Sequence, residues 1–389
     1  LLIDANVNET NKNADKIVYS AVEDAVINLT NVNVREGFTT HTTDAKDDYL
    51  LVLDGSGATF KVGGDTGKTT TQFGNYLYTF TKGTTDGTLK VTEKLNVDIS
   101  LKDYITANEK GILINTYSFD DNETLSEAIT TGEAKDTYAL GMNGKNLTGG
   151  GTNNGITVSS EKELTINGAN GSISGFDTAL TNNGTLNLEN VIFGNNTTAA
   201  VSNTGTLNLA GTNTFNSKIT GTGSATNTGT LNISADNLDI ALTNNNILNL
   251  GEGTLGKAIT GEGTIVTTGD VSSNASYLGN AVTNDSTLTL LGGSITARAI
   301  LDATVSGNGT TNFGNGTNSS FIQVDKAVSQ AISINQFADV TANVDMGTSG
   351  KGFNILSGGK LTTNASYIKP SNLVNNGTLN LTGGTADEK

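Results

Sequence analysis

One nine-residue segment recurs six times, and it is the feature that most constrains how this 389-residue chain can fold. Its consensus is Leu or Val, Thr or Ser, Asn, Asn or Thr, Gly, Thr, Leu, Asn, Leu, and its copies begin at Leu180, Val201, Ala225, Leu242, Val282 and Leu373. Leu-Asn-Leu alternates apolar and polar residues, as a strand with one buried face does, and the preceding Asn-Gly or Thr-Gly is typical of a tight turn. The marker leucines of the first four copies lie 21, 24 and 17 residues apart, so the period is about twenty.

A period of this length, made of short strands and turns without helical periodicity, predicts an all-β, right-handed parallel β-helix, or solenoid. Successive coils would stack about 4.8 Å apart, so that equivalent leucines form an aliphatic column beside ladders of asparagine. The predicted column contains Leu186, Leu207, Leu231 and Leu248. The composition of 48 Gly and 1 Pro agrees with this fold, because corners favour Gly, whereas Pro removes a donor from the sheet.

The repeat copies divide the chain into two predicted parts. Residues 141–389 form the regular solenoid, and we expect them to belong to a longer chain. Residues 1–140 contain seven of the nine tyrosines and many of the charges, with strand-like runs such as Tyr76–Phe80. This part is predicted to be either an irregular β-helix with longer loops or a β-rich N-terminal cap. A short helical turn is predicted over Asp121–Ile129.

The charge and the cysteine count exclude several classes of partner. A formal charge of -16, from 22 basic and 38 acidic residues, repels nucleic acids and anionic lipid surfaces, so no nucleic acid is expected as a partner. No stretch approaches about 18 consecutive apolar residues, so we expect no direct membrane insertion by this segment. Without cysteine, the chain forms neither disulfides nor thiolate metal sites.

Catalytic machinery is scarce in the sequence. The single histidine, His41, lies in a polar stretch that is typical of a solvated loop, and no Gly-Asp-Ser-Gly nucleophile motif occurs. Three groups of carboxylates could in principle supply an acid and a base, although surface charge is the simpler interpretation. These groups are Asp44, Asp47 and Asp48; Asp120 and Asp121; and Asp236 and Asp239. We therefore predict no enzyme, with a polysaccharide lyase or glycoside hydrolase on a β-helix scaffold as the alternative.

No cofactor or metal site is predicted. Calcium-binding roll repeats show tandem Gly-Gly-x-Gly-x-Asp, and Gly63–Gly67 is a solitary, loose counterpart. Structural calcium is compatible with such a loop but is not indicated by it.

The stretch from Asn182 to Asn196 resembles the repeat of polymorphic outer-membrane proteins and related adhesins, which are autotransporter (type V secretion) passenger domains. That repeat often has Asn-x-Gly-x-Leu followed by Phe-x-x-Asn, and Phe193 and Asn196 match its second half, whereas the companion Gly-Gly-Ala-Ile element is missing. The resemblance extends over residues 140–389. It implies a passenger at the bacterial cell surface or outside the cell, tethered or released through an outer-membrane translocator that this chain does not contain.

The expected function is therefore that of an adhesin or structural stalk. Its expected partners are a host or abiotic surface, a glycan, or the same protein on a neighbouring cell, which includes self-association. The predicted contact surface uses tyrosines, because tyrosine combines apolar area with a polar hydroxyl. These residues are Tyr49, Tyr76, Tyr78, Tyr104 and Tyr117. The alternative is that these tyrosines fill an irregular core.

Overall fold

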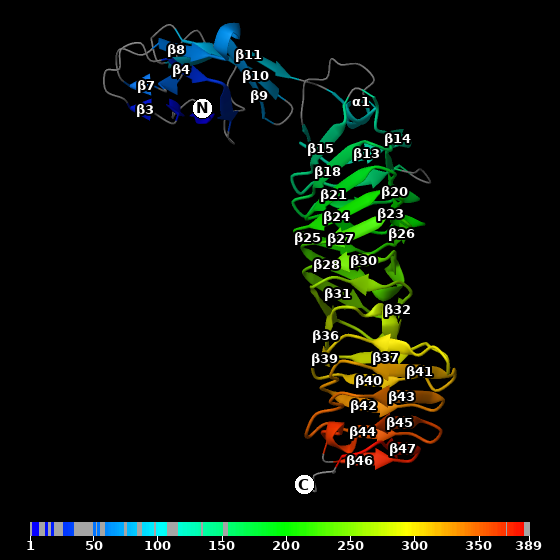
Figure 1. Cartoon of the computed structure of the whole chain (residues 1–389). Helices are drawn as coiled ribbons and strands as arrows, with labels where there is room; N and C mark the ends of the chain where they lie inside the picture. The colour runs from blue at the N-terminus through cyan, green and yellow to red at the C-terminus, as the bar shows by residue number, and fades with distance from the viewer. Residues whose placement is uncertain are drawn as a thin grey trace. The chain divides into compact units, whose positions relative to one another are not determined.

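The computed structural model divides the chain into two compact units, residues 1–118 and residues 119–389. It describes residues 2–7, 12–14, 17–18, 26–34, 50–51, 53–54, 59–73, 76–83, 88–96, 99–106, 116–133, 135–150, 155–370 and 372–384. Figure 1 shows the strands of the second unit stacked one above another along its length.

The first unit combines parallel and antiparallel strands. Its parallel pairs are β1 (Leu2–Val7) with β5 (Asn31–Val34), β3 (Ile17–Val18) with β7 (Leu53–Asp54), and β4 (Val26–Leu29) with β8 (Thr59–Val62). These pairs follow one another in the same order, as in two irregular coils. β2 (Lys12–Ala14) pairs antiparallel with β1, and an antiparallel sheet contains β6 (Leu50–Leu51), β9 (Lys68–Phe73), β10 (Tyr76–Lys82) and β11 (Thr88–Asn96).

The second unit is a β-solenoid of about 12 turns, which confirms the predicted fold class. Each coil contributes strands to three sides. The first side is sheet 1, with β15 (Thr137–Gly141), β18 (Glu163–Asn167), β21 (Thr185–Glu189), β24 (Thr206–Ala210), β27 (Ser224–Asn227), β30 (Leu242–Asn244) and β33 (Ile259–Thr260). The second side is sheet 2, with β13 (Glu123–Leu125), β16 (Leu147–Gly149), β19 (Ser172–Ser174), β22 (Ile192–Phe193), β25 (Thr212–Phe215), β28 (Thr230–Ser234), β31 (Ile247–Gly251), β34 (Thr264–Thr267), β36 (Ala281–Asn284) and β39 (Val305–Ser306).

The third side begins as sheet 3 and continues as sheet 4. Sheet 3 contains β14 (Ile129–Thr130), β17 (Ile156–Val158), β20 (Thr178–Asn182), β23 (Ala199–Asn203), β26 (Ile219–Gly221) and β29 (Leu238–Asp239). Sheet 4 contains β32 (Gly253–Leu255), β35 (Val271–Asn274), β37 (Thr287–Leu291), β40 (Thr310–Phe313), β42 (Ala331–Ile334), β44 (Phe353–Ile355) and β46 (Leu373–Asn375). In the last coils sheet 5 follows sheet 4, with β38 (Ala299–Leu301), β41 (Ser320–Val324), β43 (Ala338–Ala342), β45 (Lys360–Thr363) and β47 (Thr378–Leu381).

Short helical turns mark the places where the sheets change. The 3-10 turn η3 (Ala235–Asn237) packs against β32, where sheet 4 starts, and η4 (Ala275–Tyr277) packs against β38, where sheet 5 starts. Two further 3-10 turns are η2 (Gly64–Thr66) and η5 (Ala365–Tyr367). The α-helix α1 (Leu101–Ile105) is capped at its N-terminus by Ser100, whose hydroxyl accepts a hydrogen bond from the Asp103 amide.

The core is a column of apolar side chains that alternate with outward polar ones along each strand. In β24, Leu207 and Leu209 are fully buried, whereas Thr206 and Asn208 point outward and are exposed. The rings of Phe193 and Phe215 stack from one coil to the next with centroids 4.6 Å apart. Burial of such apolar area is the main force that holds the coils together.

Fully buried asparagines occupy the corners between sheets. At the corner between sheets 3 and 1, Asn182 Nδ2 donates to Asn203 Oδ1 at 2.6 Å, and at the corner between sheets 1 and 2, Asn227 Nδ2 donates to Asn244 Oδ1 at 2.8 Å. Their amides also satisfy backbone groups of the turn, as when Asn203 Nδ2 donates to the Ser224 carbonyl at 2.9 Å. The third residue of the repeat therefore closes a corner and links it to the next coil.

Each asparagine ladder ends at a glycine. Gly221 takes the place of Asn203 one coil later, with φ of 126°, and a Cβ atom there would lie 1.9 Å from the Asn203 carbonyl oxygen. Gly261 and Gly307 end the other ladders in the same way, after Asn244 and Asn284. Buried amides from the following coil then bond the same corners: Asn280 Nδ2 donates to the Asn244 carbonyl at 3.1 Å, and Gln330 Nε2 to the Asn284 carbonyl at 3.2 Å.

The predicted leucine column is wrong in its second half. Leu186 does lie beside Leu207, but Leu207 is followed by Ala225, whereas Leu231 and Leu248 pair with each other in sheet 2. The reason is that the coil after Thr206 has 18 residues, because Thr206 pairs with Ser224, while the repeat copies there are 24 residues apart. An 18-residue coil with three sides has about six residues in each side, which equals this difference. The repeat therefore moves from the corner between sheets 3 and 1 to the corner between sheets 1 and 2.

Parallel pairing extends to residues before 141, where an irregular β-helix was one of the two predictions: β13 pairs with β16, and Tyr138 of β15 pairs with Leu164 of β18. One further feature differs from the sequence-based expectation. The segment Asp121–Ile129 forms β13 instead of a helical turn, because its Leu125 is needed in the core of the first coil.

Replacing Asn203 by alanine should destabilise the solenoid by about 2 kcal/mol, because it leaves buried backbone and amide partners without hydrogen bonds. Asn208→Ala, a change of the same type at an exposed position five residues along, should change stability by less than about 0.5 kcal/mol. Urea unfolding followed by circular dichroism measures both. Equal losses for the two variants would contradict the corner role of Asn203.

Restoring the repeat consensus at Gly221 should also destabilise the protein. Gly221→Asn places a Cβ atom against the Asn203 carbonyl oxygen at a φ that favours glycine, so we expect a loss of about 2 kcal/mol or more. Gly256→Asn is the control, because nothing lies within 4 Å of a Cβ atom there. A Gly221→Asn protein with an unchanged melting temperature would show that the ladder end is not a steric requirement.

Candidate functional site

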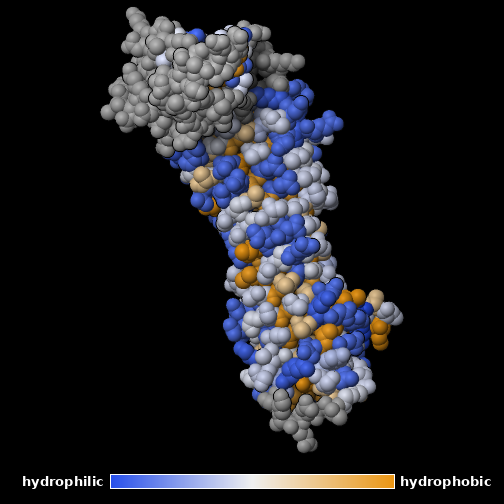
Figure 2. Space-filling view, turned by 60° about the vertical axis from the view of Figure 1, so that its left-hand side comes forward, coloured by the Kyte–Doolittle hydropathy of each residue, from blue (hydrophilic) through white to orange (hydrophobic). Residues whose placement is uncertain are grey.

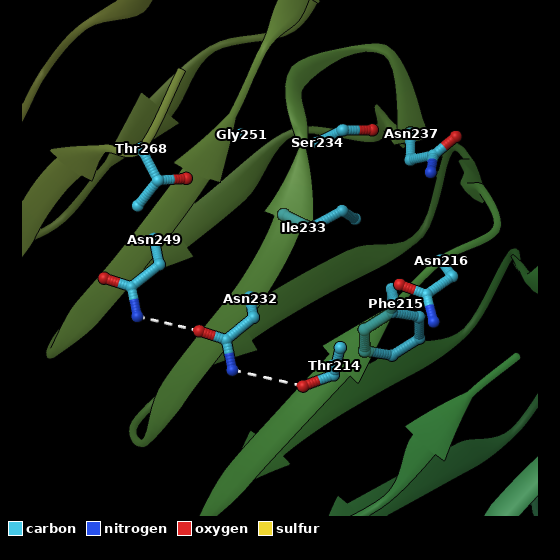
Figure 3. Close-up of a pocket in the computed structure, with 10 residues that line it drawn as sticks. All are labelled: Thr214, Phe215, Asn216, Asn232, Ile233, Ser234, Asn237, Asn249, Gly251 and Thr268. Carbon is cyan, nitrogen blue, oxygen red and sulfur yellow. Dashed lines mark hydrogen bonds between the residues drawn. The ribbon is translucent and has the colours of Figure 1, made fainter. Parts of the chain in front are cut away.

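The outer surface of sheet 2 carries a hydrogen-bonded column of polar side chains. Asn249 Nδ2 donates to Asn232 Oδ1 at 2.7 Å, and Asn232 Nδ2 donates to Thr214 Oγ1 at 3.1 Å, so three coils are joined side chain to side chain (Figure 3). Parallel register places these residues directly above one another. Because each amide holds its neighbour in place, the column is pre-ordered before any ligand arrives.

A hollow of about 450 Å³ lies beside this column. Figure 3 shows Asn216 and Asn237 on the opposite side of the hollow from Asn249. It is lined by Thr214, Phe215, Asn216, Asn232, Ile233, Ser234, Asn237, Asn249, Gly251 and Thr268. Phe215 is buried, and the polar groups of the lining are hydroxyls and amides. Such a surface can hydrogen-bond to an extended polar ligand, but its lining contains no ionisable group for proton transfer.

A second polar column follows the outer surface of sheet 1. Asn208 Nδ2 donates to Asn187 Oδ1 at 2.8 Å, and Asn187 Nδ2 donates to Glu163 Oε1 at 2.7 Å. At its upper end, Lys162 is largely buried, with its Nζ atom 3.1 Å from Asp136 Oδ1 and 3.6 Å from Glu133 Oε2. The hydrogen bond to Asp136, together with the charge of Glu133, raises the pKa of Lys162 despite its burial.

Sheet 5 presents a charged cluster instead. Asp339 Oδ1 accepts from Arg298 Nη2 at 2.9 Å, and Asp339 Oδ2 accepts from Lys360 Nζ at 2.9 Å. Burial alone would raise the pKa of Asp339, but the hydrogen bonds from Lys360 and Arg298 outweigh it and lower that pKa. Arg298 also donates to the Asp339 carbonyl at 2.7 Å and lies over the ring of Phe321 at 5.9 Å. The cluster fastens three coils and was not predicted from the sequence.

The predicted tyrosine surface does not form among the tyrosines that the structure describes. Tyr78, Tyr104 and Tyr117 are buried, and the rings of Tyr104 and Tyr117 contact each other with centroids 5.7 Å apart. Tyr49 lies outside the described residues, and of Tyr76 the structure gives its place in β10 but not its side chain. The three buried tyrosines contribute their rings to the core, as the alternative prediction has it.

The predicted carboxylate groups do not converge where the structure describes them. Asp236 Oδ1 accepts from the Thr254 amide at 2.8 Å, and Asp239 pairs with Lys257 at 3.5 Å, so each is engaged separately. Asp120 and Asp121 are exposed in the bend before β13. His41, Asp44, Asp47 and Asp48 lie outside the described residues.

Neither a metal-binding group of side chains nor a membrane-spanning helix occurs in the described part of the chain. No group of three His, Cys, Asp or Glu residues there could hold a metal ion. The loop at Gly63–Gly67 forms η2, with both end glycines in the left-handed conformation. No helix in the described ranges combines the length and apolar character needed to cross a bilayer.

Comparison with known proteins finds no match among protein-family models, curated proteins or solved structures. Function is therefore inferred from the surface of the chain itself.

Asp339→Asn should destabilise the protein by about 1–3 kcal/mol at pH 7, because Arg298 and Lys360 lose their charged partner in a partly buried site. Since the folded-state pKa of Asp339 is lowered, its contribution is present above the unfolded pKa of about 3.9 and is lost as the pH falls through the folded pKa. The difference in urea midpoint between wild type and variant should therefore shrink at acid pH.

Asp345→Asn is the matched control. Asp345 pairs with Lys369 at 3.1 Å, but both side chains are about half exposed, so the loss should stay below about 1 kcal/mol. A larger effect at Asp345 than at Asp339 would contradict the assigned role of the sheet 5 cluster.

Proposed function

We propose that this chain is an adhesin or structural stalk of the autotransporter-passenger type, displayed at a bacterial cell surface or released from it, and that it attaches without catalysing a reaction. Its partners would be a host or abiotic surface, a glycan, or the same protein on a neighbouring cell. The observation that supports this most is the polar column on sheet 2, where Thr214, Asn232 and Asn249 present a hydrogen-bonding group on three successive coils.

A repeated surface suits attachment better than chemistry. Adjacent coils lie about 4.8 Å apart, so an extended ligand meets equivalent groups at a regular spacing and gains many weak contacts at once. About 12 turns at that spacing give a solenoid roughly 55 Å long, and the polar column occupies three of its coils. The resemblance of the repeat around Asn182–Asn196 to outer-membrane adhesins agrees with this role.

Attachment can be tested with bacterial cells that display the chain through a foreign translocator. They should bind at least one of several glycan-coated, protein-coated or plain surfaces about tenfold better than cells displaying an unrelated domain, because many copies act together. The combined variant Thr214→Ala, Asn232→Ala and Asn249→Ala should remove most of the binding. The matched control changes three outward hydroxyls of sheet 3: Thr157→Ala, Thr181→Ala and Ser202→Ala.

Displaying cells that bind no surface better than control cells would contradict the proposal. Release of reducing sugar from a panel of polysaccharides by the purified chain would favour the alternative, a lyase or hydrolase.

A further inference from the structure

Exposed apolar side chains gather on the last coils of the solenoid. Figure 2 shows apolar residues there, some of them on a projection. The loops 292–298, 335–337 and 356–359 all connect sheet 4 to sheet 5, so they lie along one edge. Each presents one large apolar residue: Ile295 is 76% exposed, Phe337 49% and Leu356 41%. We call these three residues the apolar corner. Ile300, on the adjoining strand β38, is 43% exposed.

The first loop is held rigidly. Ile295 stands at the tip of a tight turn in which the Ser294 amide donates to the Ala297 carbonyl at 2.7 Å, and the Ala297 amide donates back to Ser294. Arg298 anchors the end of the loop through Asp339. Little conformational freedom would therefore be lost when a partner covers Ile295.

Phe337 is held outward at a cost in backbone energy. Its φ is +63°, a left-handed conformation that is unusual for a bulky residue, and glycine occupies the equivalent position one coil later, at Gly358. The Phe337 amide donates to the Gly358 carbonyl at 3.2 Å, and its own carbonyl accepts from Ser320 at 3.1 Å. An exposed aromatic ring kept in a strained conformation points to a binding role.

Charge changes along the solenoid at the same place. Residues 119–291 contain 16 acidic and 5 basic residues, a net charge of -11, whereas residues 292–384 contain 4 acidic and 5 basic residues, a net charge of +1. Two copies of the chain would repel each other along the acidic coils. Contact at the last coils meets less of that repulsion.

The side chains of the corner favour a protein partner over a glycan. Of the exposed residues there, only Phe337 offers a sugar a flat ring to stack on, whereas Ile295, Leu356 and the adjoining Ile300 are aliphatic and offer neither a ring nor a hydrogen bond. Aliphatic and aromatic groups with balanced charge around them are instead typical of the centre of a protein interface.

We propose that the apolar corner is a self-association surface at which two copies of this chain pair, with the same face contributed by each copy. This inference rests on the proposed attachment role. Among the partners proposed above, it specifies a second copy of the same protein. A same-face contact closes on itself, so the product is a dimer instead of a filament.

The full chain should show a concentration-dependent monomer–dimer equilibrium in sedimentation velocity. The double variant Ile295→Asn with Phe337→Gly should weaken dimerisation at least about tenfold, as loss of central interface residues does. Both replacements suit the local backbone, because glycine relieves the strain at residue 337, so the melting temperature should stay unchanged or rise. Ile247→Asn is the control, because Ile247 is an exposed apolar residue of the acidic coils.

Salt distinguishes this pairing from contact between basic and acidic regions. Raising the salt concentration from about 0.05 M to about 0.5 M should strengthen the dimer, because it screens repulsion between the acidic coils. A dimer that salt dissociates, one that the double variant leaves intact, or a wild type that stays monomeric at about 100 µM would each overturn the inference.

These outcomes are separate from those of the surface-binding test. Displaying cells that bind a surface while the purified chain stays monomeric would overturn self-association and leave the attachment role standing. A salt-strengthened dimer whose displaying cells neither clump nor bind a surface would support this interface and contradict the attachment role.

Discussion

Parallel stacking of coils in register is the constraint on which the rest of this structure depends. Along the strands, backbone groups pair with the coil above or below, so each strand residue has a fixed neighbour one coil away, and like residues such as Leu186 and Leu207 come into contact. The buried asparagines extend this pairing to the corners, where no strand continues. Asn182 and Asn203 bond to each other and to the turn between the strands, which makes the corner as regular as the sides.

The same constraint explains why ladders stop. Asparagine needs room at the corner, and at Gly221 the chain passes so close to the Asn203 carbonyl that no side chain fits. The repeat then reappears one side further on, at Asn227, and after Gly261 it moves again, to Asn284. The repeat thus specifies the structure of a corner, with its asparagine and its turn. The length of the coils decides which two sheets that corner joins.

This distinction shows how much the sequence could reveal. Leu-Asn-Leu alternation and a period near twenty identify the solenoid, because both follow from residues close together in the chain. Coil length varies with each loop, so the pairing of Leu207 with Ala225 was not foreseen. Lys360 lies one coil after Asp339, and Arg298 lies two coils before it. Their cluster can be recognised only when the register between the coils is known. The helix α1 was missed although Ser100 and Asp103 supply its cap.

Function in such a fold depends on what the coils carry outward, since the interior is filled by side chains. Along the acidic coils, Thr214, Asn232 and Asn249 repeat one polar group, which suits a ligand that is itself repetitive. From residue 292 onward the charges balance, and the loops hold Ile295 and Phe337 away from the core. A rod that repels its copies along most of its length but not at these coils can be crowded on a surface and still pair at one place. The strained backbone at Phe337 makes sense on this view, because a glycine there would fold more easily but would carry no side chain to bury.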